Sequence, residues 1–119
     1  MQSARASDPS CLFCRIVRRE IPSTPVYEDA EFYAFRDIAP KAPTHVLVIP
    51  KAHLPGLSAA SPADAPLLAR LLLVFAGIAK KEKADDYRLV VNNGADAGQS
   101  VDHLHAHLLA GRSFRWPPG

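Results

Sequence analysis

The chain has 119 residues, of which 48% are hydrophobic and 22% charged, and its formal net charge is +2. That length suits one domain with a real core, and the composition is ordinary for a soluble globular protein. The small, mixed charge argues against a nucleic-acid or membrane surface, and no uninterrupted apolar run approaches the roughly 18 residues needed to span a bilayer. These features predict a cytoplasmic, single-domain protein that binds neither nucleic acid nor a membrane.

The N-terminal half predicts a tail, a short helix and three strands. Residues 1–9 are small and polar with no apolar stretch after them, so we expect a disordered tail, not a signal peptide, before a domain over residues 10–119. Asp8 or Ser10 can cap a helix over residues 10–20, which Pro22 ends. Aromatic and β-branched residues predict strands in "PVYED" (25–29), "EFYAFRDI" (31–38) and "HVLVIPK" (45–51).

The C-terminal half predicts one long helix and two more strands. "SPAD" at 61–64 supplies a capping serine, a proline and an acidic residue, and "KKEK" at 80–83 places positive charge in the last turn of this helix. "YRLVVNN" (87–93) and "VDHLHAHLLA" (101–110) predict strands on either side of a glycine-containing loop. Two helices and five strands, with hairpin-length connections in the first half, predict an α+β fold around a five-stranded antiparallel sheet.

Three of the five histidines occupy alternate positions in the last predicted strand: His103, His105 and His107. Side chains two residues apart on a strand leave the same face, roughly 6.5 to 7 Å apart, so a row of imidazoles is expected there. Burying imidazoles costs free energy and gains little from packing. Three in register therefore indicate a functional site, in which neutral imidazole can act as nucleophile, proton carrier or metal ligand.

The loop before these histidines favours phosphorus chemistry. Gly94 and Gly98 permit positive φ and close approach of the backbone, while Asn92, Gln99 and Ser100 add side-chain donors. Most loops of this composition are only turns. Beside three imidazoles, however, neutral donors fixed in advance suit a phosphate oxyanion, because they stabilise charge that grows in the transition state.

The segment "QSVDHLHAHLL" is similar to the histidine-triad pattern of the HIT superfamily, in which His and apolar residues alternate. "REIPSTPVYED", "AFRDIAPKAPTHVLVIPKAH", "RLVVNNGADAGQS" and the terminal "WPPG" resemble its Hint branch, the histidine-triad nucleotide-binding proteins. The resemblance implies a HIT-like fold and a homodimer in which the sheets of two protomers join. It also implies that the tail carrying Trp116 reaches toward the partner's active site.

The same resemblance implies a catalytic role for each histidine of the site. His105 matches the nucleophile that attacks the α-phosphorus of a purine nucleoside monophosphate, giving a covalent nucleotidyl-histidine that water hydrolyses. His107 and His45 match the other active-site imidazoles, Asp37 matches a carboxylate that binds the ribose hydroxyls, and Ser100 is a candidate proton relay to the leaving amine. The implied nucleotide-binding residues are Phe13, Ile16, Phe35, Asp37, Ile38, Leu47, Asn92, Gly98, Gln99, Ser100, His105, His107 and Trp116.

The pair Cys11 and Cys14 in "CLFC" is compatible with a disulfide, a redox pair or half of a zinc site. A redox pair would follow a strand in a βαβ unit, and none precedes it; a cytosolic setting argues against a structural disulfide. Zinc needs two more ligands, which His53 and His103 can supply. Some HIT relatives carry such a site, whereas many Hint proteins lack the cysteines. A zinc ion held by four protein ligands would be structural.

The function predicted from these residues and the resemblance is that of a purine nucleoside phosphoramidase. It would hydrolyse adenosine or guanosine 5′-monophosphoramidates, such as AMP linked to an amine or to lysine, with no organic cofactor. One alternative is a dinucleoside polyphosphate hydrolase of the Fhit branch, against which the "WPPG" ending argues. Another is a non-catalytic, zinc-stabilised nucleotide-binding or scaffold protein, against which His105 in the central position argues.

Overall fold

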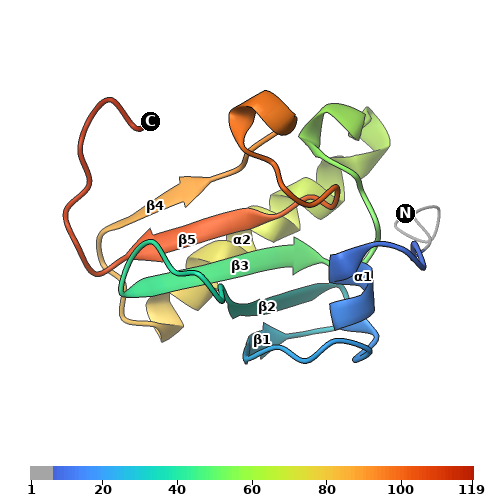
Figure 1. Ribbon diagram of the computed structural model, residues 1–119, viewed down its shortest axis with the longest axis horizontal. Coiled ribbons are helices and arrows are strands. Elements are labelled where there is room, and N and C mark those ends of the chain that lie inside the picture. The colour runs from blue at the N-terminus through green and yellow to red at the C-terminus, as the bar shows by residue number, and fades with distance from the viewer. Residues whose placement is uncertain (1–6) are drawn as a thin grey trace.

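The computed structural model describes residues 7–119 as a five-stranded antiparallel sheet in the order β1-β2-β3-β5-β4 with two α-helices. Helix α2 runs behind the sheet and α1 lies in front of it, beside the end of β3 (Figure 1). The predicted α+β architecture is confirmed. The elements are α1 (Leu12–Val17), β1 (Pro25–Glu28), β2 (Phe32–Arg36), β3 (Thr44–Pro50), α2 (Ala65–Lys81), β4 (Tyr87–Val90) and β5 (Ala106–Ala110), with 3₁₀ turns at Leu57–Ala59, Pro62–Asp64 and Ala95–Ala97.

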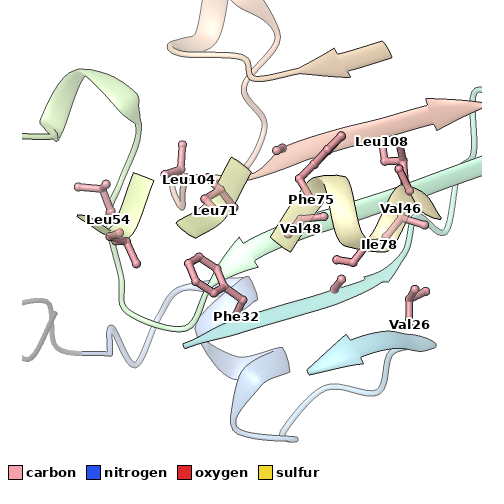
Figure 2. Close-up of a cluster of buried hydrophobic side chains, with 14 residues drawn as sticks. Val26, Phe32, Val46, Val48, Leu54, Leu71, Phe75, Ile78, Leu104 and Leu108 are labelled. Carbon is pink, nitrogen blue, oxygen red and sulfur yellow. The ribbon is translucent and has the colours of Figure 1, made fainter. Parts of the chain in front are cut away.

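The strands send alternate side chains into two separate apolar clusters, one on each face of the sheet. Toward α2, Phe32 and Ala34 of β2 meet Val46 and Val48 of β3 in the larger cluster, which Figure 2 shows. The intervening residues, such as Phe35 and its neighbours on β3, point to the opposite face and pack with α1. That second cluster contains Cys11, Phe13, Cys14, Ile16, Tyr33, Phe35, Leu47 and Ile49.

Helix α2 forms as predicted, with a 3₁₀ turn as its first turn. The Asp64 carboxylate accepts a hydrogen bond from the backbone N–H of Ser61 at 2.9 Å, which is one half of a capping box. Leu67, Leu71 and Phe75 recur every four residues and are buried against the sheet. Residues 62–81, with a mean hydropathy of 1.5, are long and apolar enough to cross a membrane by length and composition alone. Part of that composition is the stripe buried against the sheet, whereas Leu72 and Leu73 are exposed.

Helix α1 is shorter than predicted and begins differently. Its N-cap is Cys11, whose Sγ accepts a hydrogen bond from the N–H of Cys14 at 3.4 Å. The Asp8 carboxylate instead accepts hydrogen bonds from the backbone and hydroxyl of Ser10, both at 2.8 Å, so neither of the two predicted side chains caps the helix. The helix ends at Val17, since Arg19 adopts a positive φ of 64°.

The predicted strand over residues 101–110 is half as long in the structure, and this corrects the expected row of imidazoles. β5 begins at Ala106, so His107 is the one histidine of the alternating three that lies on a strand. The β4–β5 ladder stops at the end of β4, where Val90 pairs with His107, and the β3–β5 ladder stops one residue further on, where Val48 pairs with Ala106, although β3 itself continues to Pro50. The chain before Ala106 therefore makes irregular bonds, including that from the Leu104 N–H to the Leu54 carbonyl at 2.6 Å.

Of the predicted tail over residues 1–9, residues 1–6 lie outside the described part of the chain. Ser7 and Asp8 are described and both contact α1. The Arg18 guanidinium donates to the Ser7 hydroxyl, and the N–H of Asp8 donates to the Cys14 sulfur at 3.4 Å. The chain thus reaches the first turn of α1 with its backbone already tied to that helix.

Candidate active site and metal centre

Two histidines from adjacent strands form the centre of the site on the α1 face. His107 on β5 and Leu47 on β3 are paired, so His45 is a diagonal neighbour of His107 on the same face. His45 Nε2 lies 2.9 Å from His107 Nδ1. Asp37, just beyond β2, brings its Oδ2 to 3.4 Å from the same Nε2 atom. Three neighbouring strands therefore deliver one carboxylate and two imidazoles to one point.

Burial keeps this imidazole pair neutral near pH 7. Desolvation, together with the nearby His105 and His45, lowers the pKa of His107 to about 4, while Asp37 acts in the opposite direction. Burial likewise lowers the pKa of His45, partly offset by the attraction of Asp37. Neutral imidazoles each carry one N–H and one lone pair, so the direction of the shared hydrogen bond is decided by their other contacts.

His105 is buried, with 4% of its surface exposed, and its ring centroid lies 5.0 Å from that of His107. Its Nδ1 atom lies 2.7 Å from the main-chain carbonyl oxygen of His103. A carbonyl oxygen only accepts, so Nδ1 carries the proton and donates it. The Nε2 atom of the neutral ring is consequently a free lone pair, which is the form a nucleophile or a ligand requires.

Four of the five apolar residues predicted to hold a base lie together. Phe13 places its ring edge-on to that of His105 with centroids 5.1 Å apart, and edge-on to that of Phe35 at 5.5 Å. Ile16 and Leu47 belong to the same buried cluster. Ile38 is fully exposed and lies outside it.

The loop over residues 91–100 has the backbone that its glycines predicted. Gly94 and Gly98 have φ angles of 93° and 98°, in the region that favours glycine. The Gln99 side chain stabilises this loop through three hydrogen bonds. Its amide nitrogen donates to the carbonyls of Pro55 at 2.8 Å and Val101 at 3.1 Å, and its oxygen accepts from the Gly94 N–H at 2.8 Å. The side chain thus shapes the loop from within.

The remaining residues of that loop lie closer to the surface. The Asn92 amide lies beside Gly98, where an added Cβ would be 3.7 Å from its Nδ2 atom. Ser100 is exposed and borders an open hollow of about 540 Å³, which Cys11 and His53 also line. The loop therefore reaches the outer side of the cysteine cluster.

Trp116 lies away from these residues, with 82% of its surface exposed. The tail that carries it is held by Phe114, whose ring lies 5.2 Å from the Arg88 guanidinium and 4.3 Å from that of Arg112. The Arg88 guanidinium also donates to the Arg115 carbonyl at 3.0 Å. These contacts fasten the tail beside the β4 edge of the sheet.

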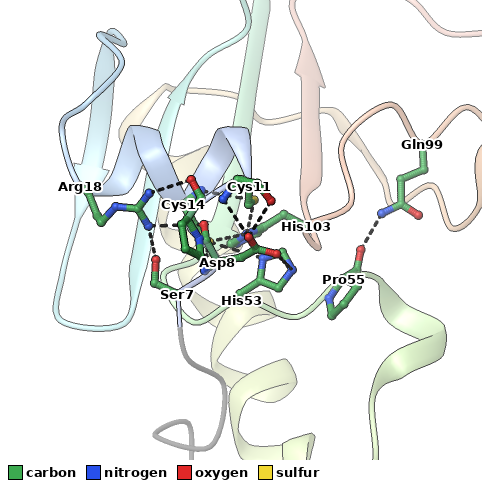
Figure 3. A network of polar contacts seen from close by, with 11 residues as sticks. Ser7, Asp8, Cys11, Cys14, Arg18, His53, Pro55, Gln99 and His103 are labelled. Atoms are coloured by element: carbon green, nitrogen blue, oxygen red, sulfur yellow. Dashed lines mark hydrogen bonds and ion pairs between the residues drawn. The ribbon is translucent and has the colours of Figure 1, made fainter.

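A second cluster gathers Cys11, Cys14, His53 and His103, whose four ligand atoms lie within 4.8 Å of one another (Figure 3). His103 Nδ1 is 3.4 Å from Cys11 Sγ, 3.6 Å from Cys14 Sγ and 3.2 Å from His53 Nδ1; Cys14 Sγ is 3.4 Å from His53 Nδ1. A tetrahedral zinc site requires S–N edges of about 3.6 Å and an N–N edge of about 3.4 Å, given the usual bond lengths. The four residues fit such a metal.

The orientation of His103 agrees with metal ligation. Its Nε2 atom lies 2.7 Å from the Pro50 carbonyl oxygen, so Nε2 carries the proton and the Nδ1 lone pair faces the sulfurs. Burial lowers the pKa of His103 to about 4, which keeps the ring neutral. Both cysteines are free thiols, and burial raises the pKa of Cys11. This is a closed Cys/His metal-binding geometry.

Asp37, His45 and His107 also place three ligand atoms within 4.8 Å, but their protons oppose a cation. The Lys41 N–H donates to His45 Nδ1 at 3.0 Å, so the neutral His45 ring carries its proton on Nε2, the atom that a metal would need. This cluster therefore suits hydrogen bonding to an anion.

The functional groups that the sequence analysis missed belong to the main chain. The Lys41 N–H, the His103 carbonyl and the Pro50 carbonyl each fix the tautomer of one histidine. Main-chain groups leave no signature in residue identity. The proline-rich "APKAPT" segment predicted a loop, without indicating which of its amides would face the site.

The sequence and the fold match known proteins along nearly the whole chain. The HIT domain family profile matches residues 18–114. A protein of Zea mays named "14 kDa zinc-binding protein" is 49% identical over 118 residues, covering 97% of this chain and 92% of its own. A protein of Arabidopsis thaliana named "Adenylylsulfatase HINT1" is 46% identical over 120 residues, covering 98% of this chain and 82% of its own.

A solved structure agrees equally well. The HIT family hydrolase from Legionella pneumophila superposes with a TM-score of 0.89 at 47% identity, covering 92% of this chain and 100% of that one. The chain therefore belongs to the HIT domain family, and within it to the Hint branch. Its class is that of the HIT family hydrolases, which bind nucleotides.

Proposed function

We propose that this protein is a purine nucleoside phosphoramidase that hydrolyses adenosine or guanosine 5′-monophosphoramidates through a nucleotidyl-histidine. The observation that carries the proposal is the bond from His105 Nδ1 to the His103 carbonyl at 2.7 Å. It leaves a lone pair on Nε2 of a buried ring that contacts the rings of Phe13 and His107, and such a lone pair can act as a nucleophile.

The proposed reaction has two displacements at the α-phosphorus. In the first, His105 Nε2 forms a bond to phosphorus while the bond to the amine breaks, and the leaving nitrogen takes up a proton from solvent, with Ser100 as the proposed relay. In the second, water attacks phosphorus and gives up a proton to solvent, the bond to His105 breaks, and the nucleoside monophosphate leaves. His107 is assigned to donate a hydrogen bond to the phosphoryl oxygens throughout, and His45 supports it from behind through the hydrogen bond between the two rings.

Binding of the nucleotide is assigned to the residues around this histidine. The Asp37 carboxylate accepts the Ala39 N–H at 2.7 Å through Oδ1 and keeps acceptor capacity for ribose hydroxyls. Phe13, Ile16, Phe35 and Leu47 supply the apolar surface for the purine, and Ile38 joins them only if the base extends to its exposed side chain. Asn92, Gly98 and Gln99 position the phosphate-facing loop.

We further propose a structural zinc ion in the cluster of Cys11, Cys14, His53 and His103. The support is that the distances between their ligand atoms are close to the edges of a zinc tetrahedron. Zinc there would crosslink α1 to the segments before α2 and β5. His53 and His103 would bind through their Nδ1 atoms and the two cysteines as thiolates. Four protein ligands leave no position for water, so catalysis stays with the imidazoles. The free cysteine pair also fits the cytoplasmic setting that we propose.

A homodimer is part of the proposal. β4 is an edge of the sheet and exposes 41% of Tyr87 and 37% of Leu89. A second copy joining its own β4 would cover this edge and place each tail, with its exposed Trp116, toward the partner. The domain on its own leaves both that edge and that indole uncovered.

The name of the Arabidopsis relative points to adenylyl sulfate as a second candidate substrate for the same chemistry. Both substrates place a leaving group on the α-phosphorus of AMP. Turnover on an adenosine phosphoramidate, on adenylyl sulfate and on diadenosine triphosphate separates these activities. The phosphoramidate is expected to give the highest kcat/KM, and a preference for the dinucleotide would favour the Fhit-like alternative.

Mass spectrometry of the protein quenched during turnover is the direct test. We expect an AMP adduct on His105, and we expect His105→Asn to lose the adduct and at least about 10⁴-fold in kcat while its thermal unfolding stays cooperative. A wild-type protein that binds AMP but forms no adduct and turns over none of the three substrates would support the non-catalytic scaffold instead.

A further inference from the structure

We propose that the main-chain N–H of Lys41, braced by Arg112, fixes the protons of the His45–His107 pair so that His107 presents an Nε2–H donor to the substrate. The proposal rests on the proposed function for the identity of that substrate, a phosphoryl group. The assignment of the protons rests on geometry alone.

Three contacts around His45 agree on where its proton lies. The Lys41 N–H points at Nδ1 from 3.0 Å, and an amide N–H only donates, so Nδ1 must be a lone pair. The Asp37 carboxylate, which only accepts, lies 3.4 Å from Nε2. His107 Nδ1 lies 2.9 Å from the same atom. The neutral ring of His45 therefore carries its proton on Nε2 and donates it toward His107.

This donation decides the tautomer of His107. Its Nδ1 accepts from His45, so the single proton of the neutral ring is on Nε2, the nitrogen on the far side from His45. An N–H can donate to a phosphoryl oxygen, whereas a lone pair at the same place would repel it. The Lys41 amide thus sets, across two rings, whether the site stabilises or opposes charge on the substrate.

The backbone of Lys41 is also held by Arg112, which follows β5, at the peptide group next to the one that carries the Lys41 N–H. Arg112 Nε donates to the Lys41 carbonyl oxygen at 3.0 Å, and its Nη1 donates to the Ser113 carbonyl at 3.0 Å. Gly111, with a φ of 94°, lets this turn pack closely, because an added Cβ would lie only 2.9 Å from Pro43 Cβ. Lys41 and Arg112 are positioning residues, since both act through His45.

Histidine 15N NMR on the wild-type protein tests the assignment directly. At pH 7.5, with ¹⁵N-labelled histidine and signals assigned from single-histidine variants, we expect His45 and His107 to show a protonated Nε2 and an unprotonated Nδ1. His105 should show the opposite pattern because its Nδ1 donates to a carbonyl. A protonated Nδ1 on His45 or on His107 overturns the proposal.

A backbone substitution tests the cause. Replacing Lys41 by its α-hydroxy acid analogue turns the N–H into an ester oxygen and keeps the side chain; the matched control Lys41→Ala keeps the N–H and removes the side chain. We expect the ester to lose the pure His45 tautomer and about five- to tenfold in kcat, as for one hydrogen bond. The alanine variant should retain the His45 spectrum. An ester protein with unchanged His45 signals and unchanged kcat overturns the proposal.

Arg112→Ala tests the brace in the same two readouts. We expect His45 to gain a minor Nδ1–H population and kcat to fall about two- to threefold, which is the loss of part of one hydrogen bond. An unaltered His45 spectrum would remove Arg112 from the proposal. If the predicted tautomers are found but no nucleotide substrate is hydrolysed, the proposed function fails and the proton assignment stands.

Discussion

The two imidazole clusters lie a few residues apart in the chain, yet they use histidine in opposite ways. In the cysteine cluster, His103 turns its N–H toward the Pro50 carbonyl, so that its lone pair joins the thiols. In the other cluster, the Lys41 N–H donates to the Nδ1 lone pair of His45, so that the His45 ring turns its own N–H toward His107. The same side chain becomes a cation ligand or an anion donor according to which main-chain group faces its second nitrogen.

His103 joins the two clusters, and its replacement should have the largest effect on both. His103→Ala removes one of four metal ligands and the anchor to Pro50, so we expect metal affinity to fall at least about 100-fold. The segment whose carbonyl orients His105 would also loosen, and kcat should fall about 10-fold or more. Metal content by mass spectrometry and steady-state kinetics measure the two effects.

His53→Ala is the matched control for that variant, because it removes a metal ligand without altering the segment before β5. Its metal affinity should fall as far as that of His103→Ala, with a smaller loss of kcat. Equal losses of kcat in the two variants would show that the ion, and not the His103 anchor, orients His105.

Acid should lower stability next through both clusters, because burial lowers the pKa of His103 as well as that of His107 to about 4. The pKa of His107 is lowered from 6.5 to about 4, so the unfolded chain binds more protons than the folded one between these values. The free energy of unfolding is therefore unaffected by this group above about pH 6.5. It declines as the pH falls toward 4, and His107 accounts for up to about 3 kcal/mol of that decline. Urea unfolding from pH 7.5 to 4 measures the slope, and His107→Gln should reduce it. A slope identical in both proteins would assign the acid sensitivity elsewhere.

Phe13 should show the smallest effect, shared by both clusters. Its ring lies edge-on to those of His103 and His105, with centroids 5.9 and 5.1 Å apart. Phe13→Leu keeps the site apolar but removes the edge-on ring contacts with the two histidines. We therefore expect the free energy of unfolding to fall by about 1 kcal/mol and the KM for the nucleotide to rise a few-fold. Thermal unfolding and kinetics check this, and a change of kcat alone would argue against a role in base binding.

The fold was predictable where periodicity and end signals agree. The aromatic and β-branched runs became β1, β2 and β3, and "SPAD" began the long helix. The alternation of Leu104 and Leu108 with the histidines survives, since both leucines pack toward α2. The length of β5 was not predictable, because its pairing with β4 stops at Val90 and its pairing with β3 stops at Val48, and neither position is marked in the sequence of β5 itself.

The candidate site was predictable in its side chains and not in their orientations. Spacing placed His105 and His107 in one site, to which the resemblance to the HIT superfamily added His45. Residue type placed the two cysteines with His53 in another, and the geometry brings each set together. Which ring nitrogen carries the proton depends on carbonyls and amides that any residue could supply. The tautomers could therefore be assigned only from the positions of main-chain groups in the structure.

The strand order has a consequence for how this molecule fluctuates. Asp37, His45 and His107 extend from β2, β3 and β5, which are the three strands with a neighbour on each side. Transient opening of a sheet begins at its edges, here β1 and β4, where each strand has a single hydrogen-bonded partner. Fraying of either border leaves the three inner strands zipped together, so amide hydrogens flanking the imidazole pair should be among the slowest in the chain to exchange with solvent.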